Sequence, residues 1–218
     1  MPTRQRFANT WLAVGCTTDP EPVYRDLRRR YAEDGRYYHT WAHISECIVR
    51  LDRFRHLAKH PDEVEMALYW HDAVYAFLRG RKPVEDNEEQ SAWLCRDAMV
   101  AGGAPDDVTV RCMSLIMATR HTGDVLTGDK ALAADLDMAI MGESSRRYLQ
   151  ASTQIASEYQ QGMNLTHEQF REGRTKFLTR TLQRFMVGPP LFHTAELAAK
   201  YTRQAEVNIR HELDLLRF

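Results

Sequence analysis

The chain has 218 residues, a formal net charge of −1, 44% hydrophobic residues and 27% charged residues. These values are ordinary for a globular protein, and the length allows one large domain or two small ones. A net charge so close to zero supplies no field that would attract a nucleic-acid polymer or an anionic membrane, and no apolar run approaches the roughly 18 residues of a membrane span.

The cysteines and the first residues bear on the compartment. Cys16, Cys47, Cys95 and Cys112 lie far apart in the sequence and form no CxxC pair. We therefore expect reduced thiols in the core of a cytoplasmic protein. Residues 1–14 carry charged and polar side chains where a signal peptide would have an apolar core, so we expect a helix there.

Apolar residues recur at helical spacing along most of the chain, and capping or breaking residues separate the helical stretches. Phe7, Trp11 and Val14 mark the first helix, and Thr40 is expected to cap the third. A basic loop at 79–83 follows the fourth helix. The expected helices cover, in chain order, residues 1–14, 19–34, 40–54, 61–75, 87–102, 105–119, 132–140, 145–161, 166–186 and 194–215.

No stretch shows the sustained alternation that is typical of a strand, and no repeat or linker divides the chain. The sequence therefore predicts an all-α fold, in which residues 1–218 form a single-domain irregular helical bundle.

The most informative stretch is the pair His71-Asp72, which lies among aromatic and small apolar residues. Burying ionisable groups is costly unless they are paired or bound to a metal, and both residue types are metal ligands. A hydrogen-bonded histidine beside a solvated aspartate is the alternative that the dipeptide alone leaves open.

Other candidate ligands lie upstream and downstream of this pair. His39 and His43 are spaced i, i+4, which places them on one helix face if the helix has begun at His39. Asp135 and Asp137 lie in an apolar stretch further on. His43, His71, Asp72 and one of these aspartates would form a nitrogen and oxygen set that leaves positions open for water, as catalytic metal sites do.

The order of these residues resembles the HD superfamily of metal-dependent phosphohydrolases and, more narrowly, a bacterial family of predicted metal-dependent HD phosphohydrolases. The similar segments are Arg36-Tyr37-Tyr38-His39 with His43, Trp70-His71-Asp72-Ala73-Val74-Tyr75, Asp86-Asn87-Glu88-Glu89 with Ser91-Ala92, Thr119-Arg120-His121, Asp135-Leu136-Asp137-Met138 with Ile140 and Gly142, and a weaker set of Arg203, Ala205, Asn208 and Glu212. The resemblance implies an HD-type helical fold, a divalent metal ion and hydrolysis of phosphate esters.

The resemblance also implies roles for single residues. His43, His71 and Asp72 correspond to the first three metal ligands, and Asp137 is favoured over Asp135 as the fourth. The implied ion is Mn, Fe, Ni, Co, Zn or Mg, with one per chain. His39 would protonate the leaving group, as the equivalent histidine can in related HD phosphodiesterases, or Tyr38 and His39 would only shape the start of the helix.

Further roles follow from the chemistry of the residues. Asp72 or Asp135 would accept a proton from the metal-bound water. Arg36 is a candidate for binding a substrate phosphate, as are Arg79, Arg81 and Lys82 if they are not simply a solvated basic loop. Glu88 would contact the site from outside the ligand set or complement a helix dipole, and His121 would contact substrate or serve a second metal.

The sequence thus predicts a cytoplasmic metal-dependent hydrolase, a phosphomonoesterase or phosphodiesterase acting on a small phosphorylated metabolite or nucleotide. We expect neither a nucleic-acid polymer nor a membrane as partner, and a homodimer is compatible with the sequence. Two alternatives stay open, an HD-fold iron oxygenase and a non-catalytic module that senses or binds a nucleotide.

Overall fold

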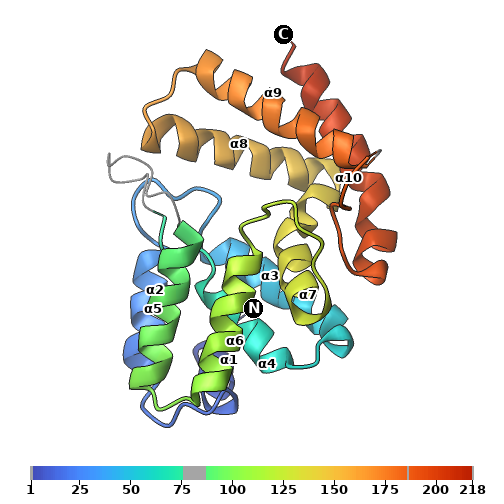
Figure 1. The fold of residues 1–218 in the computed structure, drawn as a ribbon. Helices are drawn as coiled ribbons and strands as arrows, with labels where there is room; N and C mark the ends of the chain where they lie inside the picture. Colours follow the sequence, from blue (N-terminus) through green and yellow to red (C-terminus); the bar gives the residue numbers. More distant parts are fainter. Residues whose placement is uncertain (1, 76–86, 186, 218) are drawn as a thin grey trace.

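The computed structural model describes residues 2–75, 87–185 and 187–217, and Figure 1 traces their path. Within these ranges the chain forms helices and no strand, which confirms the all-α class. The α-helices are α1 (Arg4–Ala13), α2 (Glu21–Arg30), α3 (Trp41–Phe54), α4 (Pro61–Trp70), α5 (Asn87–Ala101), α6 (Asp106–Ala118), α7 (Gly128–Met138), α8 (Ser145–Gly162), α9 (His167–Arg184) and α10 (Ala195–Leu215), with the 3₁₀ helices η1 (Arg55–Leu57) and η3 (Ala139–Gly142).

Local signals explain where several helices begin. The Thr40 side chain accepts a hydrogen bond from the backbone N–H of Ala42 and caps α3, as the sequence predicts. Thr166 and Gln169 form a reciprocal capping box at the start of α9. Pro61 occupies the first turn of α4, where its missing N–H costs no helical hydrogen bond.

Helix α4 lies at the centre of the molecule and packs against α1, α3, α5, α6 and α7. Residues 63–70 are all buried, including two carboxylates. Glu65 lies 2.6 Å from the Arg6 guanidinium of α1, and Glu63 lies 2.8 Å from that of Arg111 in α6. These ion pairs neutralise the buried charges and attach the neighbouring helices to α4.

The C-terminal helices form the other part of the molecule. In Figure 1, α8 and α9 lie side by side across the top, and α10 runs along one edge. Buried Glu212 of α10 accepts hydrogen bonds from Arg174 of α9 and from Ser152 of α8. Helix α10 also packs closely against η3, because Gly142 leaves room for the backbone of Tyr201.

The fourth helix is shorter than the sequence predicts, which is a correction to the expected range of 61–75. Helix α4 ends at Trp70, and His71 and Asp72 lie in the turn that follows. The backbone N–H of Val74 donates to the Ser91 hydroxyl of α5 at 3.0 Å, whereas a continuing helix would direct it to the carbonyl of Trp70, which instead accepts from the N–H of Ala73. A tertiary contact therefore ends this helix.

Other helix limits differ by smaller amounts. Helix α7 begins at Gly128, four residues before the expected start of 132, and α2 ends at Arg30 where the sequence predicts a stop near 34.

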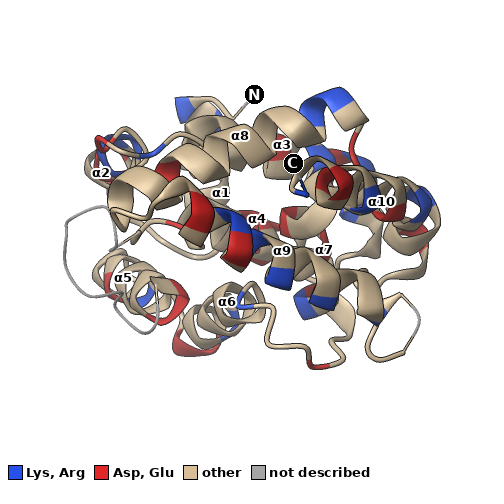
Figure 2. Ribbon diagram, turned by 90° about the horizontal axis from the view of Figure 1, so that it is seen from above, with Lys and Arg blue, Asp and Glu red and all other residues tan. Residues whose placement is uncertain are grey.

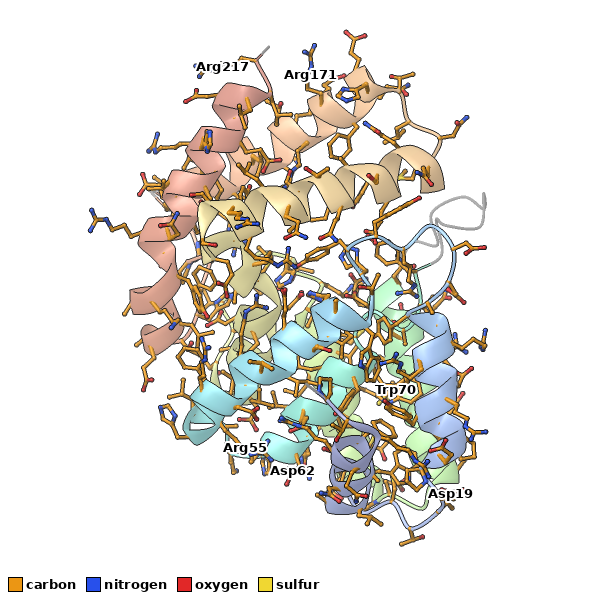
Figure 3. The ribbon with its side chains drawn as sticks, turned by 180° about the vertical axis from the view of Figure 1, so that it is seen from behind. Asp19, Arg55, Asp62, Trp70, Arg171 and Arg217 are labelled. Atoms are coloured by element: carbon orange, nitrogen blue, oxygen red, sulfur yellow. The ribbon has the colours of Figure 1, made fainter. Side chains whose placement is uncertain are left out.

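Figure 3 places Trp70, the last residue of α4, in the interior, whereas Arg171 and Arg217 lie at the surface. Among the described helices, none combines the length and the apolar character needed to cross a lipid bilayer.

Candidate metal centre

Three elements bring their side chains to one point. His43 lies in the first turn of α3, His71 follows the last residue of α4, and Asp137 is in the last turn of α7. The His43 Nε2 atom lies 3.1 Å from His71 Nε2 and 3.1 Å from Asp137 Oδ1. These three donor atoms form a cluster that is able to hold a metal ion.

Asp72 adds a fourth oxygen to the same pair of nitrogens. Its Oδ2 atom lies 3.0 Å from His71 Nε2 and 3.4 Å from His43 Nε2. This oxygen is itself buried and has no hydrogen-bond partner of good geometry. Donor atoms bound to one ion at about 2.1 Å lie roughly 3.0–3.4 Å apart in octahedral or tetrahedral geometry, so these spacings fit a shared cation.

The orientation of His71 also suits a ligand. Its Nδ1 lies 3.0 Å from the carbonyl oxygen of Leu68, which can only accept a hydrogen bond. Nδ1 therefore carries the proton, and in the neutral imidazole the lone pair of Nε2 faces the cluster. Two Nε2 lone pairs at the His43–His71 distance would repel each other without a cation or a proton between them.

The second oxygen of Asp137 is held separately. His121 Nε2 lies 2.8 Å from Asp137 Oδ2, whereas His43 and His71 approach the other carboxylate oxygen, Oδ1. His121 has a φ of 52°, an uncommon value for a residue other than glycine, in the stretch between α6 and α7. The sequence singled out His121 as a substrate or second-metal residue, and the structure places it against a candidate ligand.

The histidines keep the two carboxylates ionised. Burial alone would raise the pKa of Asp137, but hydrogen bonds from His121, His43 and His71 hold that pKa well below the usual range. Burial likewise opposes ionisation of Asp72, but the nearby His71 and His39 lower the pKa of Asp72 well below its usual value. Two anionic oxygens thus face two imidazole nitrogens, which is a donor set for a divalent cation.

His39 lies just outside this cluster and pairs with a carboxylate that the sequence did not single out. Helix α3 begins at Trp41, so His39 precedes it, but the rings of His39 and His43 still lie 5.8 Å apart. His39 Nδ1 lies 2.7 Å from Glu158 Oε2 in α8. The Oε1 atom of Glu158 accepts hydrogen bonds from the backbone N–H groups of residues 37, 38 and 39.

Glu158 is fully buried, and burial opposes its ionisation, yet its hydrogen bonds from His39 lower its pKa. An ionised Glu158 fixes the proton of His39 on Nδ1 and leaves Nε2 as the ring nitrogen that Glu158 does not engage. The available signal in the sequence was its position in the 145–161 helix, where Tyr148, Ala151 and Glu158 fall on one face. An acidic residue on an otherwise apolar face calls for a buried partner.

Asp135 does not join the cluster. It points to the other side of α7, where it is fully buried. Its two oxygens accept hydrogen bonds from the backbone N–H groups of His193 and Thr194 and from the Thr194 hydroxyl. Asp135 therefore ties α7 to the start of α10, and both of its oxygens are engaged there.

The remaining candidates lie in different surroundings. The Arg36 side chain is buried and donates to the carbonyl groups of His39, Asp72 and Ala73. It therefore holds the backbone of the segment before α3 against the turn that follows α4. Glu88 lies in the first turn of α5 and is not one of the clustered donors. Arg79, Arg81 and Lys82 lie outside the described residues.

Comparisons with protein-family models, with curated proteins and with solved structures found no match for this chain.

Proposed function

We propose that this protein is a metal-dependent phosphohydrolase, a phosphomonoesterase or phosphodiesterase that acts on a small phosphorylated metabolite or nucleotide. The observation that carries the proposal is the convergence of His43, His71, Asp72 and Asp137, with donor atoms 3.0–3.5 Å from one another across the nitrogen and oxygen pairs. The side chains of Asp72 and Asp137 are 14% and 18% exposed, whereas those of His43 and His71 are buried, so solvent reaches the site from the side of the two carboxylates.

Four protein donors would hold one divalent ion and leave at least one position for water in a five- or six-coordinate site. When bound, such an ion lowers the pKa of its water toward neutrality and polarises the phosphoryl oxygens. His43 and His71 supply neutral nitrogen donors, and His121 orients the Asp137 carboxylate through its second oxygen.

His39 and Glu158 form a hydrogen-bonded pair that would supply the general acid of the proposed site. With the proton of Nδ1 fixed by Glu158, His39 in its protonated state can deliver the proton on Nε2 to the leaving oxygen. Asp72 is the candidate acceptor for the proton of the attacking water. Asp135 has no role in the proposed mechanism, because its oxygens accept hydrogen bonds from the His193–Thr194 segment.

The two-histidine and carboxylate set is also the donor set of non-haem iron enzymes, so an oxygenase is a second candidate. Metal identity and oxygen consumption separate the two functions. Under the phosphohydrolase proposal, metal supports ester cleavage in the absence of oxygen. Under the oxygenase alternative, iron alone supports activity and one molecule of oxygen is consumed per turnover.

The test is metal analysis combined with a screen of phosphomonoesters and phosphodiesters. Purified protein is expected to bind about one divalent transition metal ion per chain, and His71→Ala to lose both metal and hydrolysis. Protein that stays metal-free after incubation with Mn, Fe, Co, Ni and Zn would remove the basis of the proposal. Metal-loaded protein that cleaves no phosphate ester would contradict the hydrolase function.

A further inference from the structure

A cavity of about 160 Å³ is lined in part by His121, whose Nε2 contacts Asp137 of the candidate metal site. Its walls come from the end of α6, the stretch between α6 and α7, the start of α7, the end of α9 and the residue before Thr194. Pockets for drug-sized ligands measure roughly 300–1,000 Å³. This cavity therefore suits one small chemical group and not a whole nucleotide.

The charged side chains around the cavity favour an anion. Lys130 and Arg184 are the cations in its wall, and Asp124 is the carboxylate. Asp124 accepts a hydrogen bond from the hydroxyl of Thr122, 2.7 Å away. Within the described ranges Lys130 makes no ion pair, so its charge is available to a ligand.

Arg184 is held in place by the chain that follows α9. Its Nε and one Nη donate to the carbonyl groups of Pro189 and Pro190 at 3.2 and 3.1 Å. Those bonds fix the guanidinium plane and leave the other Nη group to bind a ligand. A preorganised cation loses less side-chain entropy on binding than a free one.

Two histidines add neutral or positive donors to the same wall. The backbone N–H of Leu126 donates to His193 Nδ1 at 3.3 Å, so the proton of the neutral ring is on Nε2. Burial lowers the pKa of His193, which favours this neutral donor form. His121 faces the cavity with the ring whose Nε2 also contacts Asp137.

The cavity and the metal ligands lie along one face of α7. Lys130 and Asp137 are seven residues apart, which is two helical turns and about 10 Å along the axis. His121 belongs to both places, because it lines the cavity and holds the second oxygen of Asp137. A group bound beside Lys130 is thus separated from the metal site by about the length of a small metabolite.

We propose that this cavity binds a second phosphoryl group of the substrate, one that is remote from the ester that is cleaved. The substrate class is then a small metabolite or nucleotide with two separate phosphoryl groups. Lys130 and Arg184 supply the positive charge, and His193 donates a neutral hydrogen bond. The inference rests on the proposed function for the cleavage step, but binding of the remote group does not depend on metal.

The deciding experiment is a calorimetric titration of inorganic phosphate into the full-length protein after chelation of metal. Wild-type protein is expected to bind phosphate saturably, and Lys130→Gln to weaken binding at least about tenfold, as loss of a charge-assisted hydrogen bond would. Lys130→Glu should abolish binding. The matched control is Lys59→Gln, which removes an exposed positive charge near α7 and should change the affinity less than about twofold.

Saturable binding that all these variants keep would identify an adventitious ion only and overturn the proposal, as would no binding to wild type. A second arm compares KM for bisphosphorylated and monophosphorylated substrates, and Lys130→Gln should raise KM only for the former. If no ester is hydrolysed, the proposed function fails, and the phosphate titration still decides whether the anion site exists.

Discussion

Asp135 and Asp137 are two residues apart in one helix, yet they meet different surroundings. Positions i and i+2 of an α-helix point about 200° apart, so only one of the two can face the metal cluster. Asp137 faces His43 and His71, whereas Asp135 bonds to the start of α10. The spacing of residues in the sequence limits the fourth candidate metal ligand to Asp135 or Asp137. The packing of α7 decides between them, because it turns only Asp137 toward the cluster.

Exchanging each of these aspartates for asparagine should affect a different property, metal binding for Asp137 and stability for Asp135. Asp137→Asn replaces an anionic ligand with a neutral amide and should weaken metal affinity by about 10-fold or more. Asp135→Asn should retain the metal but lower the free energy of unfolding by about 1–3 kcal/mol, because an amide nitrogen cannot accept the hydrogen bonds of Thr194. Metal titration and urea unfolding of both variants measure the two effects. Loss of metal in Asp135→Asn alone would contradict this assignment.

A second prediction at this scale concerns Glu158. If Glu158 acts by positioning His39, Glu158→Gln should lower kcat by about 100-fold and leave the metal content unchanged. The double variant with His39→Ala should then be no slower than His39→Ala alone, since both changes remove the same contribution. Additive losses would mean that Glu158 acts on the site in another way, through the backbone of residues 37–39.

The sequence predicts that His43, His71, Asp72 and Asp137 lie together because their order along the chain resembles a known pattern, and the structure brings these side chains to one point. The sequence could not identify Glu158, which is 119 residues from its partner His39 and belongs to no motif. Contacts of this kind depend on how helices pack, and helical periodicity reports only which face is buried. Arg36 illustrates the same limit, because its chemistry suggested phosphate binding and its burial directs it to backbone carbonyl groups.

At the scale of helices, the sequence was most informative where a local signal exists. Thr40, Pro61 and Thr166 begin helices at the expected positions because capping depends on neighbouring residues only. The end of α4 at Trp70 was not predicted, because a side chain from another segment, Ser91 of α5, accepts the hydrogen bond of the Val74 N–H there. This early end places His71 and Asp72 in a turn, where adjacent residues can both reach one ion.

Helix packing gives a prediction for two glycines. A Cβ added at Gly142 would lie 2.5 Å from the Cβ of Tyr201 and 2.6 Å from its carbonyl oxygen, so α10 would have to move. Gly142→Ala should therefore lower the free energy of unfolding by about 1–3 kcal/mol. Gly173→Ala in α9 is the control, since a Cβ there meets nothing within 4 Å and should stabilise the helix by about 0.5–1 kcal/mol. Thermal unfolding of both variants measures the contrast.

Across the whole molecule, charges of both signs are interspersed along the helices, as Figure 2 shows. Several carboxylates are nevertheless buried, and each of them joins segments that are distant in sequence. Glu65 binds α1, Glu63 binds α6, and Glu212 holds α8 and α9 to α10. The net charge of −1 does not indicate which charged residues are buried and which lie at the surface.

These buried carboxylates make the stability of the protein depend on acid. Burial opposes the ionisation of Glu212, but Arg174 and its other partners lower the pKa below the ordinary value of 4.5. The pKa of Glu158 is lowered in the same way by His39. A group whose pKa is lower in the folded state stabilises the fold above its unfolded pKa. That stability is lost as the pH falls through the folded pKa.

Replacing Glu212 should therefore matter at neutral pH and cease to matter in acid. Glu212→Gln leaves the Arg174 guanidinium buried without its anion, and it should cost about 3 kcal/mol at pH 7. Below pH 4.5 wild-type protein loses the same interaction, so the two unfolding curves should approach each other. Glu172→Gln, which removes an exposed pair with Lys176, should follow wild type at every pH. Urea midpoints between pH 7 and pH 3 test this, and a Glu212→Gln deficit that stays constant in acid would contradict it.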